Sequence, residues 1–351
     1  MSWVTQLARP DIVALKAYEH AVWEPELERL HANEFPWRSF ADESSAGLNR
    51  YPEPQPHALV ERLATLYGVA PESVLVGRGS DEAIDLLVRG FCRAGQDSVL
   101  ICPPTFGMYS VAARIQGAGV VTVPLRAAAD FALDERAVLE KCTPDVKLVF
   151  LCSPNNPTGN LLSEDSIISL TRALEGRAVV VVDEAYIEFS GAQSLARRIG
   201  DLPQLAILRT LSKAHALAGA RCGTLLADPE VITLLRKVIP PYAIAQLSME
   251  AVLKVLEPAQ LAISRARLAT LVSERDRVLE AFAKLPNVTR VWPSAANFML
   301  VEFADAALAL ARSRGAQLLI RDVRGYPGLG RCLRITVGSP EQNNRLLEAL
   351  R

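Results

Sequence analysis

The sequence predicts an α/β fold in which a large domain, built on a mostly parallel seven-stranded sheet, is followed by a smaller α+β domain. From residue 74 to residue 227, short apolar runs alternate with amphipathic segments, which is typical of parallel strands joined by helices on both faces. After Pro240 and Pro241 the pattern changes to a long, charged, leucine-rich segment and then to short strands. The 351 residues are enough for two or three domains.

Seven apolar runs predict the strands of the large sheet. The run from Ala178 to Val182 is apolar at every position, which predicts a strand buried on both faces. A helix is expected after Gly79, because apolar residues between Ile84 and Phe91 recur at helical spacing. The expected strands are residues 74–77, 99–102, 120–125, 147–151, 178–182, 205–208 and 223–227.

The C-terminal part of the chain predicts a different architecture. One helical segment is expected at 246–284, and a capping box at Ser339–Gln342, with Pro at the first helical position, predicts the start of a last helix. Strands are expected near 289–292, 297–303, 317–320 and 332–337. We therefore expect an N-terminal arm (1–30) that partly joins the small domain, a large domain (31–243) and a small domain (244–351).

Composition excludes several classes of partner. The 38 basic and 39 acidic residues give a net charge of −1, so nothing in the charge favours nucleic acid or an anionic membrane. No apolar run approaches the roughly 18 residues of a membrane helix, and the N-terminus has no basic-then-apolar signal pattern. The six cysteines form no Cys-x-x-Cys pair, which predicts reduced thiols and a cytoplasmic protein. With four histidines and no ligand spacing, no metal site is expected.

Lys213 is the first candidate for chemistry. An apolar strand ending near Leu208 runs into the turn Thr210-Leu211-Ser212-Lys213. A lysine in apolar surroundings tends toward the neutral amine, which is suited to a Schiff base with the aldehyde of pyridoxal phosphate (PLP). A lone Ser-Lys pair is more often a surface lysine at a helix start, so this hypothesis depends on the other motifs.

Asp183 follows the Val179–Val182 run, at the carboxyl end of a buried strand, where open α/β sheets bind ligands. A carboxylate there can pair with the pyridinium nitrogen of PLP and keep it protonated. Tyr186, three residues later, can donate a hydrogen bond to the phenolate oxygen of the ring. The alternative is that the Asp is only a helix cap or turn former.

Two turns complete the pattern. Asn156, held in front of Pro157, can present its amide to the same phenolate oxygen, although Asn-Pro is also an ordinary turn. Gly79 precedes Ser80 and Asp81, whose amides would open a helix and bind a phosphate group. Taken together, these motifs predict the parts that PLP requires.

The order of these motifs resembles that of the fold-type I PLP-dependent aminotransferases, and within them the histidinol-phosphate aminotransferases. The similarity extends from about residue 30 to the end of the chain. The segments that carry it are Asn49–Pro52, Cys102–Tyr109, Ser153–Gly159, Asp183–Phe189, Ile207–Gly223 and Cys332–Gly338.

The resemblance implies a role for each residue around the cofactor. Lys213 forms the Schiff base and then carries the proton between the substrate α-carbon and the cofactor. Asp183 holds the ring nitrogen, Asn156 and Tyr186 bind the phenolate oxygen, and Phe106 stacks on the ring. The phosphate contacts are Ser80, Asp81, Ser212 and Arg221, joined by Tyr51 from the neighbouring subunit of a homodimer with shared active sites.

The resemblance also implies the substrate contacts. Arg334 binds the carboxylate of an amino-acid substrate, and Arg321 is a second arginine of this subfamily. Two guanidinium groups suit both the phosphate of L-histidinol phosphate and the carboxylates of L-glutamate and 2-oxoglutarate. Asn33 and Tyr18 are carried over as further contacts, Tyr18 toward a phosphate.

The chain departs from the family pattern in several places. His31 stands where the family has the first Asn of Asn-Ala-Asn-Glu, and Ala17 stands where relatives commonly have Pro. Phe106 lacks the hydroxyl of the Tyr that relatives often have. His215 replaces a Phe two residues after Lys213, either as a packing substitution or as a group that tunes the lysine.

The activity implied by this resemblance is a PLP-dependent transamination between L-histidinol phosphate and 2-oxoglutarate, which belongs to histidine biosynthesis. Three alternatives share the cofactor residues: an aromatic or broad-specificity aminotransferase, a PLP-dependent decarboxylase of threonine phosphate, and a PLP-binding regulator without catalysis. A regulator would normally add a DNA-binding helix-turn-helix, for which the sequence shows no spare segment or basic patch.

Overall fold

A seven-stranded sheet forms the centre of the large unit in the computed structural model, which describes residues 3–24 and 26–351. Residues 1–2 and 25 of the predicted N-terminal arm lie outside that part. The strand order is β1-β7-β6-β5-β4-β2-β3, and all pairs are parallel except those of β7 with β1 and β6, which confirms the predicted mostly parallel sheet of seven strands. The strands are β1 (Val74–Gly77), β2 (Ser98–Ile101), β3 (Gly119–Thr122), β4 (Val146–Cys152), β5 (Val179–Asp183), β6 (Leu205–Thr210) and β7 (Gly223–Leu226).

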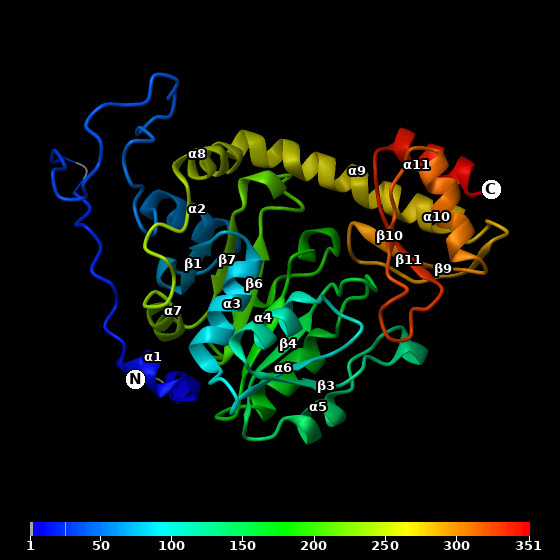
Figure 1. Cartoon of the computed structure of the whole chain (residues 1–351). Helices are drawn as coiled ribbons and strands as arrows, with labels where there is room; N and C mark the ends of the chain where they lie inside the picture. The colour runs from blue at the N-terminus through cyan, green and yellow to red at the C-terminus, as the bar shows by residue number, and fades with distance from the viewer. Residues whose placement is uncertain (1–2, 25) are drawn as a thin grey trace.

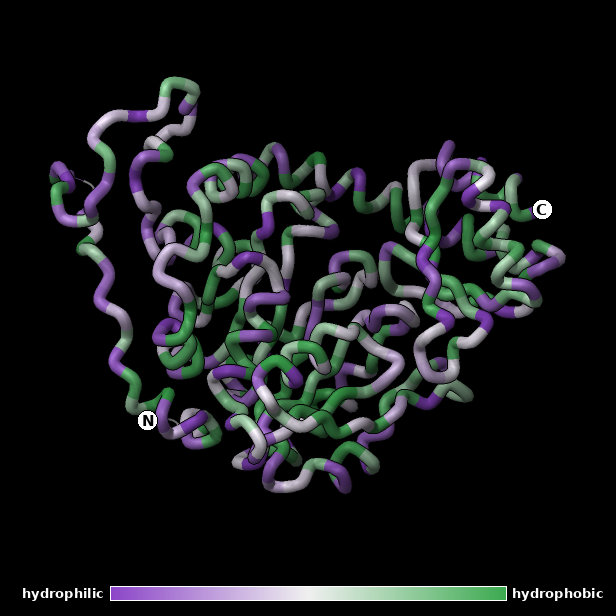
Figure 2. The backbone as a smooth tube through the Cα atoms, viewed as in Figure 1, coloured by the Kyte–Doolittle hydropathy of each residue, from purple (hydrophilic) through white to green (hydrophobic). Residues whose placement is uncertain are grey.

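Helices cover both faces of this sheet. In β5, Val179 and Val181 pack in the core cluster that includes residues of α3, α4 and α7, whereas Val180 and Val182 pack in the cluster that includes residues of α2 and α6. This alternation explains the continuous apolar run, since each face of the strand is buried. Figure 2 shows the same concentration of apolar residues in the interior. The helices are α2 (His57–Tyr67), α3 (Ser80–Phe91), α4 (Met108–Gln116), α5 (Glu135–Lys141), α6 (Glu164–Ala173), α7 (Pro229–Leu235) and α8 (Gln246–Val255).

Short 3₁₀ segments connect these elements, and two of them carry residues of the predicted site or its surroundings. These are η4, which follows Tyr186, and η6, which precedes Arg221. The segments beyond the N-terminal arm are η2 (Pro71–Ser73), η3 (Ala127–Ala129), η4 (Ile187–Phe189), η5 (Leu195–Arg198) and η6 (Ala218–Ala220).

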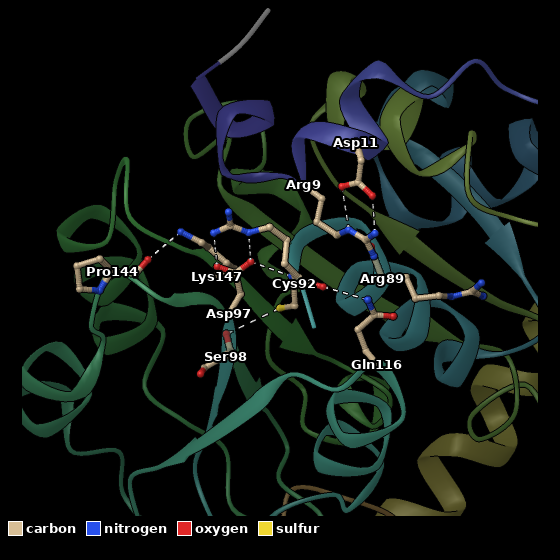
Figure 3. Close-up of polar contacts among 10 residues, drawn as sticks. Arg9, Asp11, Arg89, Cys92, Asp97, Ser98, Gln116, Pro144 and Lys147 are labelled. Carbon is tan, nitrogen blue, oxygen red and sulfur yellow. Dashed lines mark hydrogen bonds and ion pairs between the residues drawn. The ribbon is translucent and has the colours of Figure 1, made fainter. Parts of the chain in front are cut away.

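The N-terminal arm packs on the large unit. Its first elements are η1 (Trp3–Leu7) and α1 (Pro10–Ala14), and Val4 lies in the same core cluster as α3 and α7. Arg9 donates its backbone N–H to Gly90 O at 3.0 Å. Its guanidinium donates to Arg89 O at 3.1 Å (Figure 3). The first residues of the arm thus bury apolar side chains against α3 and α7, and the expectation that the arm partly joins the small domain stays a prediction.

The C-terminal unit is an antiparallel sheet with helices packed against it. Its strand order is β10-β11-β9-β8, and residues of α9, α10 and α11 share one core cluster with β9 and β11. The long helix α9 extends from the large unit to this sheet (Figure 1). The predicted capping box opens α11, with Ser339 and Gln342 as its two side chains. The elements are α9 (Pro258–Phe282), β8 (Val288–Val291), β9 (Phe298–Phe303), α10 (Ala306–Gly315), β10 (Arg321–Asp322), β11 (Cys332–Thr336) and α11 (Pro340–Ala349).

Two predicted elements differ from the structure. The helical segment 246–284 is divided between α8 and α9, because Pro258 has no N–H and disfavours helical geometry at Glu257, which is extended (φ −65°, ψ 143°). The strand predicted at 317–320 is absent there. Leu318 instead donates its N–H to Ser313 O as the chain leaves α10, and pairing with β11 begins only at Arg321.

The junction between the two units lies near α8. Ile244, Val252 and Leu256 pack in the same core cluster as α2, so α8 joins the core of the large sheet. The predicted boundary near residue 243 therefore stays a proposal. None of the helices in residues 3–24 and 26–351 combines the length and apolar character needed to cross a membrane.

Candidate active site

The site lies at the carboxyl ends of β4, β5 and β6, which meet at one edge of the large sheet. Parallel strands present their last residues on the same side, and ligands of open α/β sheets bind there. A cavity of about 150 Å³ opens at this edge. Its lining includes most of the predicted cofactor residues. The predicted residues in the lining are Ser80, Asp81, Phe106, Asn156, Asp183, Tyr186, Ser212, Lys213 and Arg221. The other lining residues are Cys152, Ala185, Thr210 and Ala218.

One end of the cavity is suited to an anion. Gly79 has φ +97°, and a Cβ built on it would lie 2.7 Å from Arg221 Nη2, so a side chain there would collide with the guanidinium. A Cβ on Gly223 would lie 2.5 Å from Ser80 N. Arg221 Nη1 is 3.5 Å from Ser212 Oγ. The two glycines thus allow the N-terminus of α3 and a guanidinium to approach each other closely, which suits a phosphate group.

Asp183 supplies the buried acidic group. Its carboxylate accepts hydrogen bonds from Tyr109 Oη at 2.7 Å and from the N–H of Ala185 at 3.1 Å. Burial raises the pKa of Asp183 to about 6, and the hydrogen bond from Tyr109 acts against this shift. A nearby cation such as a protonated ring nitrogen would favour the carboxylate form.

Tyr109 is a site residue that the sequence reasoning missed as a functional candidate. It is fully buried on α4, its ring stacks on Phe150 with centroids 4.8 Å apart, and it contacts the edge of Phe106. The signal was present in the segment Cys102–Tyr109: Phe106 and Tyr109 are three residues apart, which places them on one face where a helix begins.

Lys213 lies where an amine can react. Burial lowers its pKa, and the nearby Arg334 lowers it further. Lys213 Nζ is 5.9 Å from the centroid of the Tyr186 ring, and Asn156 Nδ2 is 3.5 Å from Tyr186 Oη. The amine of Lys213, the amide of Asn156 and the phenol of Tyr186 therefore line the same cavity.

Arg334 reaches the same volume from the C-terminal sheet. Its Nη1 donates to Asn156 Oδ1 at 2.5 Å, and its Cζ lies 5.2 Å from the centroid of the Phe298 ring. Arg321 stands directly opposite Arg334 in the β10–β11 pairing and is exposed. Arg321 and Arg334 thus stand side by side on neighbouring strands, and Arg334 contacts Asn156, which lines the cavity.

Three predicted contacts lie away from this cavity in the single chain. Tyr18 lines a separate cavity with His20 and Trp23. Asn33 is exposed with φ +55°, and the Tyr51 ring stacks on Tyr242 with centroids 4.6 Å apart. The structure brings none of these three to Lys213.

The residues at this edge fit PLP. A buried carboxylate suits the ring nitrogen, the Gly79 cradle suits the phosphate, and an amine with a lowered pKa suits the aldehyde. Fold and site together define a PLP-dependent enzyme of the fold-type I class.

Comparison with known proteins agrees with this reading. Residues 29–350 match the family model for aminotransferase class I and II, and the chain therefore belongs to that family. It is a PLP-dependent transaminase. The chain is 48% identical to the histidinol-phosphate aminotransferase of Stenotrophomonas maltophilia, over 99% of this chain and 96% of that protein.

Two solved structures are similar over most of their length. One is histidinol-phosphate aminotransferase from Sinorhizobium meliloti in complex with pyridoxal-5'-phosphate, with 26% identity, a TM-score of 0.76, and coverage of 86% of this chain and 82% of that one. The other is L-threonine-O-3-phosphate decarboxylase from Porphyromonas gingivalis, with 25% identity, a TM-score of 0.73, and coverage of 86% and 90%. The fold alone thus does not separate transamination from decarboxylation.

Proposed function

We propose that this enzyme transfers the amino group between L-histidinol phosphate and 2-oxoglutarate, giving imidazole acetol phosphate and L-glutamate, in histidine biosynthesis. Identity of 48% across nearly the whole chain with an enzyme named for this substrate supports the proposal. We also place the enzyme in the cytoplasm. The six free cysteines, all of which are buried, support this location.

The residues around the cavity divide the chemistry between them. PLP, when bound, supplies an aldehyde carbon that takes the amino group and a ring that accepts electrons from the substrate. Lys213 first holds the cofactor and then takes the proton from the substrate carbon that bears the amine. Asp183 keeps the ring nitrogen protonated, and Asn156 with Tyr186 binds the phenolate oxygen. Because Lys213 would hold the cofactor by its aldehyde, its amine would already be near the proton that it moves, and this proximity would contribute much of the rate.

The single observation that carries the substrate assignment is the hydrogen bond from Arg334 to Asn156, which lines the same cavity as Lys213. Arg334 is half-buried, and burial lowers its pKa, so an anion bound against the guanidinium would stabilise its charged form. Arg321, opposite it, provides a second cation for a phosphate dianion. We assign Asn33 and Tyr18 as further substrate contacts on the resemblance alone.

A single-turnover experiment tests the substrate. Purified holoenzyme is mixed separately with L-histidinol phosphate, L-glutamate, L-phenylalanine and L-threonine phosphate, and the absorbance of the cofactor is followed. We expect the first two to convert the cofactor to its aminated form at least about tenfold faster than phenylalanine. Equal rates with phenylalanine would identify an aromatic aminotransferase. Release of CO₂ from threonine phosphate alone would identify a decarboxylase.

The proposal includes a homodimer in which Tyr51 reaches the neighbouring site. The segment from Leu15 to Tyr51 runs along the outside of the large unit (Figure 1) and carries most of the large apolar side chains that are exposed in the described chain. Leu30, Phe35, Trp37 and Phe40 are each more than half exposed. Such a patch on one chain supports an interface with a second copy.

Subunit complementation tests this arrangement. Lys213→Ala and Tyr51→Ala chains, each impaired alone, are unfolded, mixed in equal amounts and refolded. Random pairing gives hybrid dimers with one intact site, so the mixture is expected to recover roughly a quarter of wild-type activity. If Tyr51 acts only within its own chain, the mixture will not exceed the average of the two variants.

A further inference from the structure

A buried ionic network lies behind the cavity and belongs to no role assigned above. Its centre is Arg209 on β6, whose side chain is 8% exposed. Arg209 Nη2 donates to Glu188 Oε1 at 2.6 Å, and Nη1 is 3.5 Å from Glu184 Oε2. The guanidinium also lies 4.5 Å from the centroid of the Tyr67 ring.

The two carboxylates of the network are fixed by further contacts. Glu184 is 2% exposed, and one of its oxygens accepts the N–H of Leu195 at 2.7 Å while the other accepts the hydroxyl of Ser194. Burial raises the pKa of Glu184, so its ionised form depends on the hydrogen bonds and on Arg209. Glu188 Oε2 is buried without a hydrogen-bond partner among the described residues.

His215 connects the network to the turn that carries Lys213. His215 Nε2 is 4.0 Å from Glu188 Oε1, which is too long for a hydrogen bond but close enough for attraction when the ring is protonated. Burial lowers the pKa of His215. The turn itself is tight, because Ala216 has φ +56° and donates its N–H to Lys213 O. His215 thus lies against Glu188 of the network, while Lys213, two residues earlier in the same turn, lines the cavity.

The position of the network in the sequence is informative. Glu184 directly follows Asp183, Glu188 follows Tyr186 by two residues, and both Arg209 and His215 flank Lys213. A buried ion pair adds little net stability over an apolar pair of the same shape, but it fixes one arrangement, because any other leaves a charge unpaired. Here that arrangement involves the segments that follow β5 and β6, which carry Asp183, Tyr186 and Lys213.

We propose that Arg209 is a positioning residue for the transamination, holding through Glu184 and Glu188 the strand ends that carry Asp183, Tyr186 and Lys213. The proposal rests on the roles assigned to those three residues under the proposed function. Arg209 does not touch the cavity and acts only through its neighbours. Loss of the network therefore loosens the geometry of the site without removing any group from it.

Two variants test the proposal. Glu188→Gln keeps the shape and the oxygen that accepts from Arg209 but removes the charge, and Arg209→Lys keeps the charge but removes the forked donor. In each we expect the dissociation constant for PLP to rise about fivefold or more and kcat to fall about tenfold, with KM for glutamate within about twofold. The pH midpoint of the visible absorbance change of the bound cofactor is expected to move by about half a unit or more.

Asp97→Asn is the matched control. Asp97 is a buried carboxylate paired with Arg93 at 2.7 Å on another part of the sheet (Figure 3), so its loss destabilises the fold without reaching the site. If Glu188→Gln and Arg209→Lys lower the melting temperature as Asp97→Asn does, and leave PLP binding, the midpoint and kcat as in the wild type, the proposal is wrong. Should Arg209→Lys not fold, Glu188→Gln decides alone.

A further arm separates this result from failure of the assigned roles. Lys213→Ala protein is expected to lose the pH-dependent absorbance change. If Lys213→Ala retains the absorbance change, the role assigned to Lys213 is wrong, and the positioning role that rests on it is wrong as well. If it loses the change and the network variants behave as the wild type, only the positioning role of Arg209 fails.

Discussion

Replacing Lys213 with alanine is expected to lower kcat by at least about 10³-fold, because both the covalent hold on the cofactor and the proton transfer are lost. The physical basis is the lowered pKa of this amine, which burial and Arg334 produce. Lys213→Arg should lose as much activity, since a guanidinium stays protonated and cannot act as a nucleophile or base. Rates with histidinol phosphate and glutamate, and the visible spectrum of the PLP-loaded protein, measure the effect.

Lys147→Ala is the matched control for this change. Lys147 donates to Pro144 O at 2.8 Å on the surface of the large unit (Figure 3) and has no contact with the cavity. Its activity and spectrum should match those of the wild type. Retention of turnover within about tenfold by Lys213→Ala would contradict the central role of this lysine.

Much of this site was predictable because each cofactor residue lies at a strand end or a helix start. An apolar run of the length of Val179–Val182 predicts a buried strand, and the polar residue that follows it must emerge at the edge of the sheet. The same reasoning located Asn156, Lys213 and the N-terminus of α3, and the structure brings these residues around one cavity. Their individual roles stay proposals.

The parts that were not predictable depend on contacts between distant segments. The hydrogen bond from Tyr109 to Asp183 joins residues 74 positions apart, so the local spacing of Phe106 and Tyr109 could mark a shared face but not this partner. The packing of the N-terminal arm on α3 and α7 likewise depends on tertiary burial of Val4. The strand predicted at 317–320 failed because local apolarity does not decide where an edge strand begins to pair.

The buried carboxyl group of Asp183 leads to a second large effect, on both activity and stability. Asp183→Asn is expected to lower kcat by about 10²-fold or more, since the amide cannot stabilise a protonated ring nitrogen. In the protein without PLP, the same substitution should instead be favourable, because it should increase the stability of the fold at high pH. The folded pKa of about 6 exceeds the ordinary 3.8, so the folded protein binds this proton more tightly than the unfolded chain does. The unfavourable contribution of the ionised group therefore grows as the pH rises from 3.8 to about 6 and is complete above that value.

Removing the ionisable group should thus stabilise the PLP-free protein at about pH 8, by up to about 3 kcal/mol, and have little such effect near pH 4. Thermal melts of PLP-free wild-type and Asp183→Asn protein at the two pH values measure this difference. Tyr109→Phe gives the opposing control: it removes the donor that favours the carboxylate, so it should raise the pKa of Asp183 and destabilise the PLP-free protein at about pH 8. A melting temperature that falls equally at both pH values in Asp183→Asn would show that the carboxylate carries no such cost, and that its burial is matched by partners the protein retains without its cofactor.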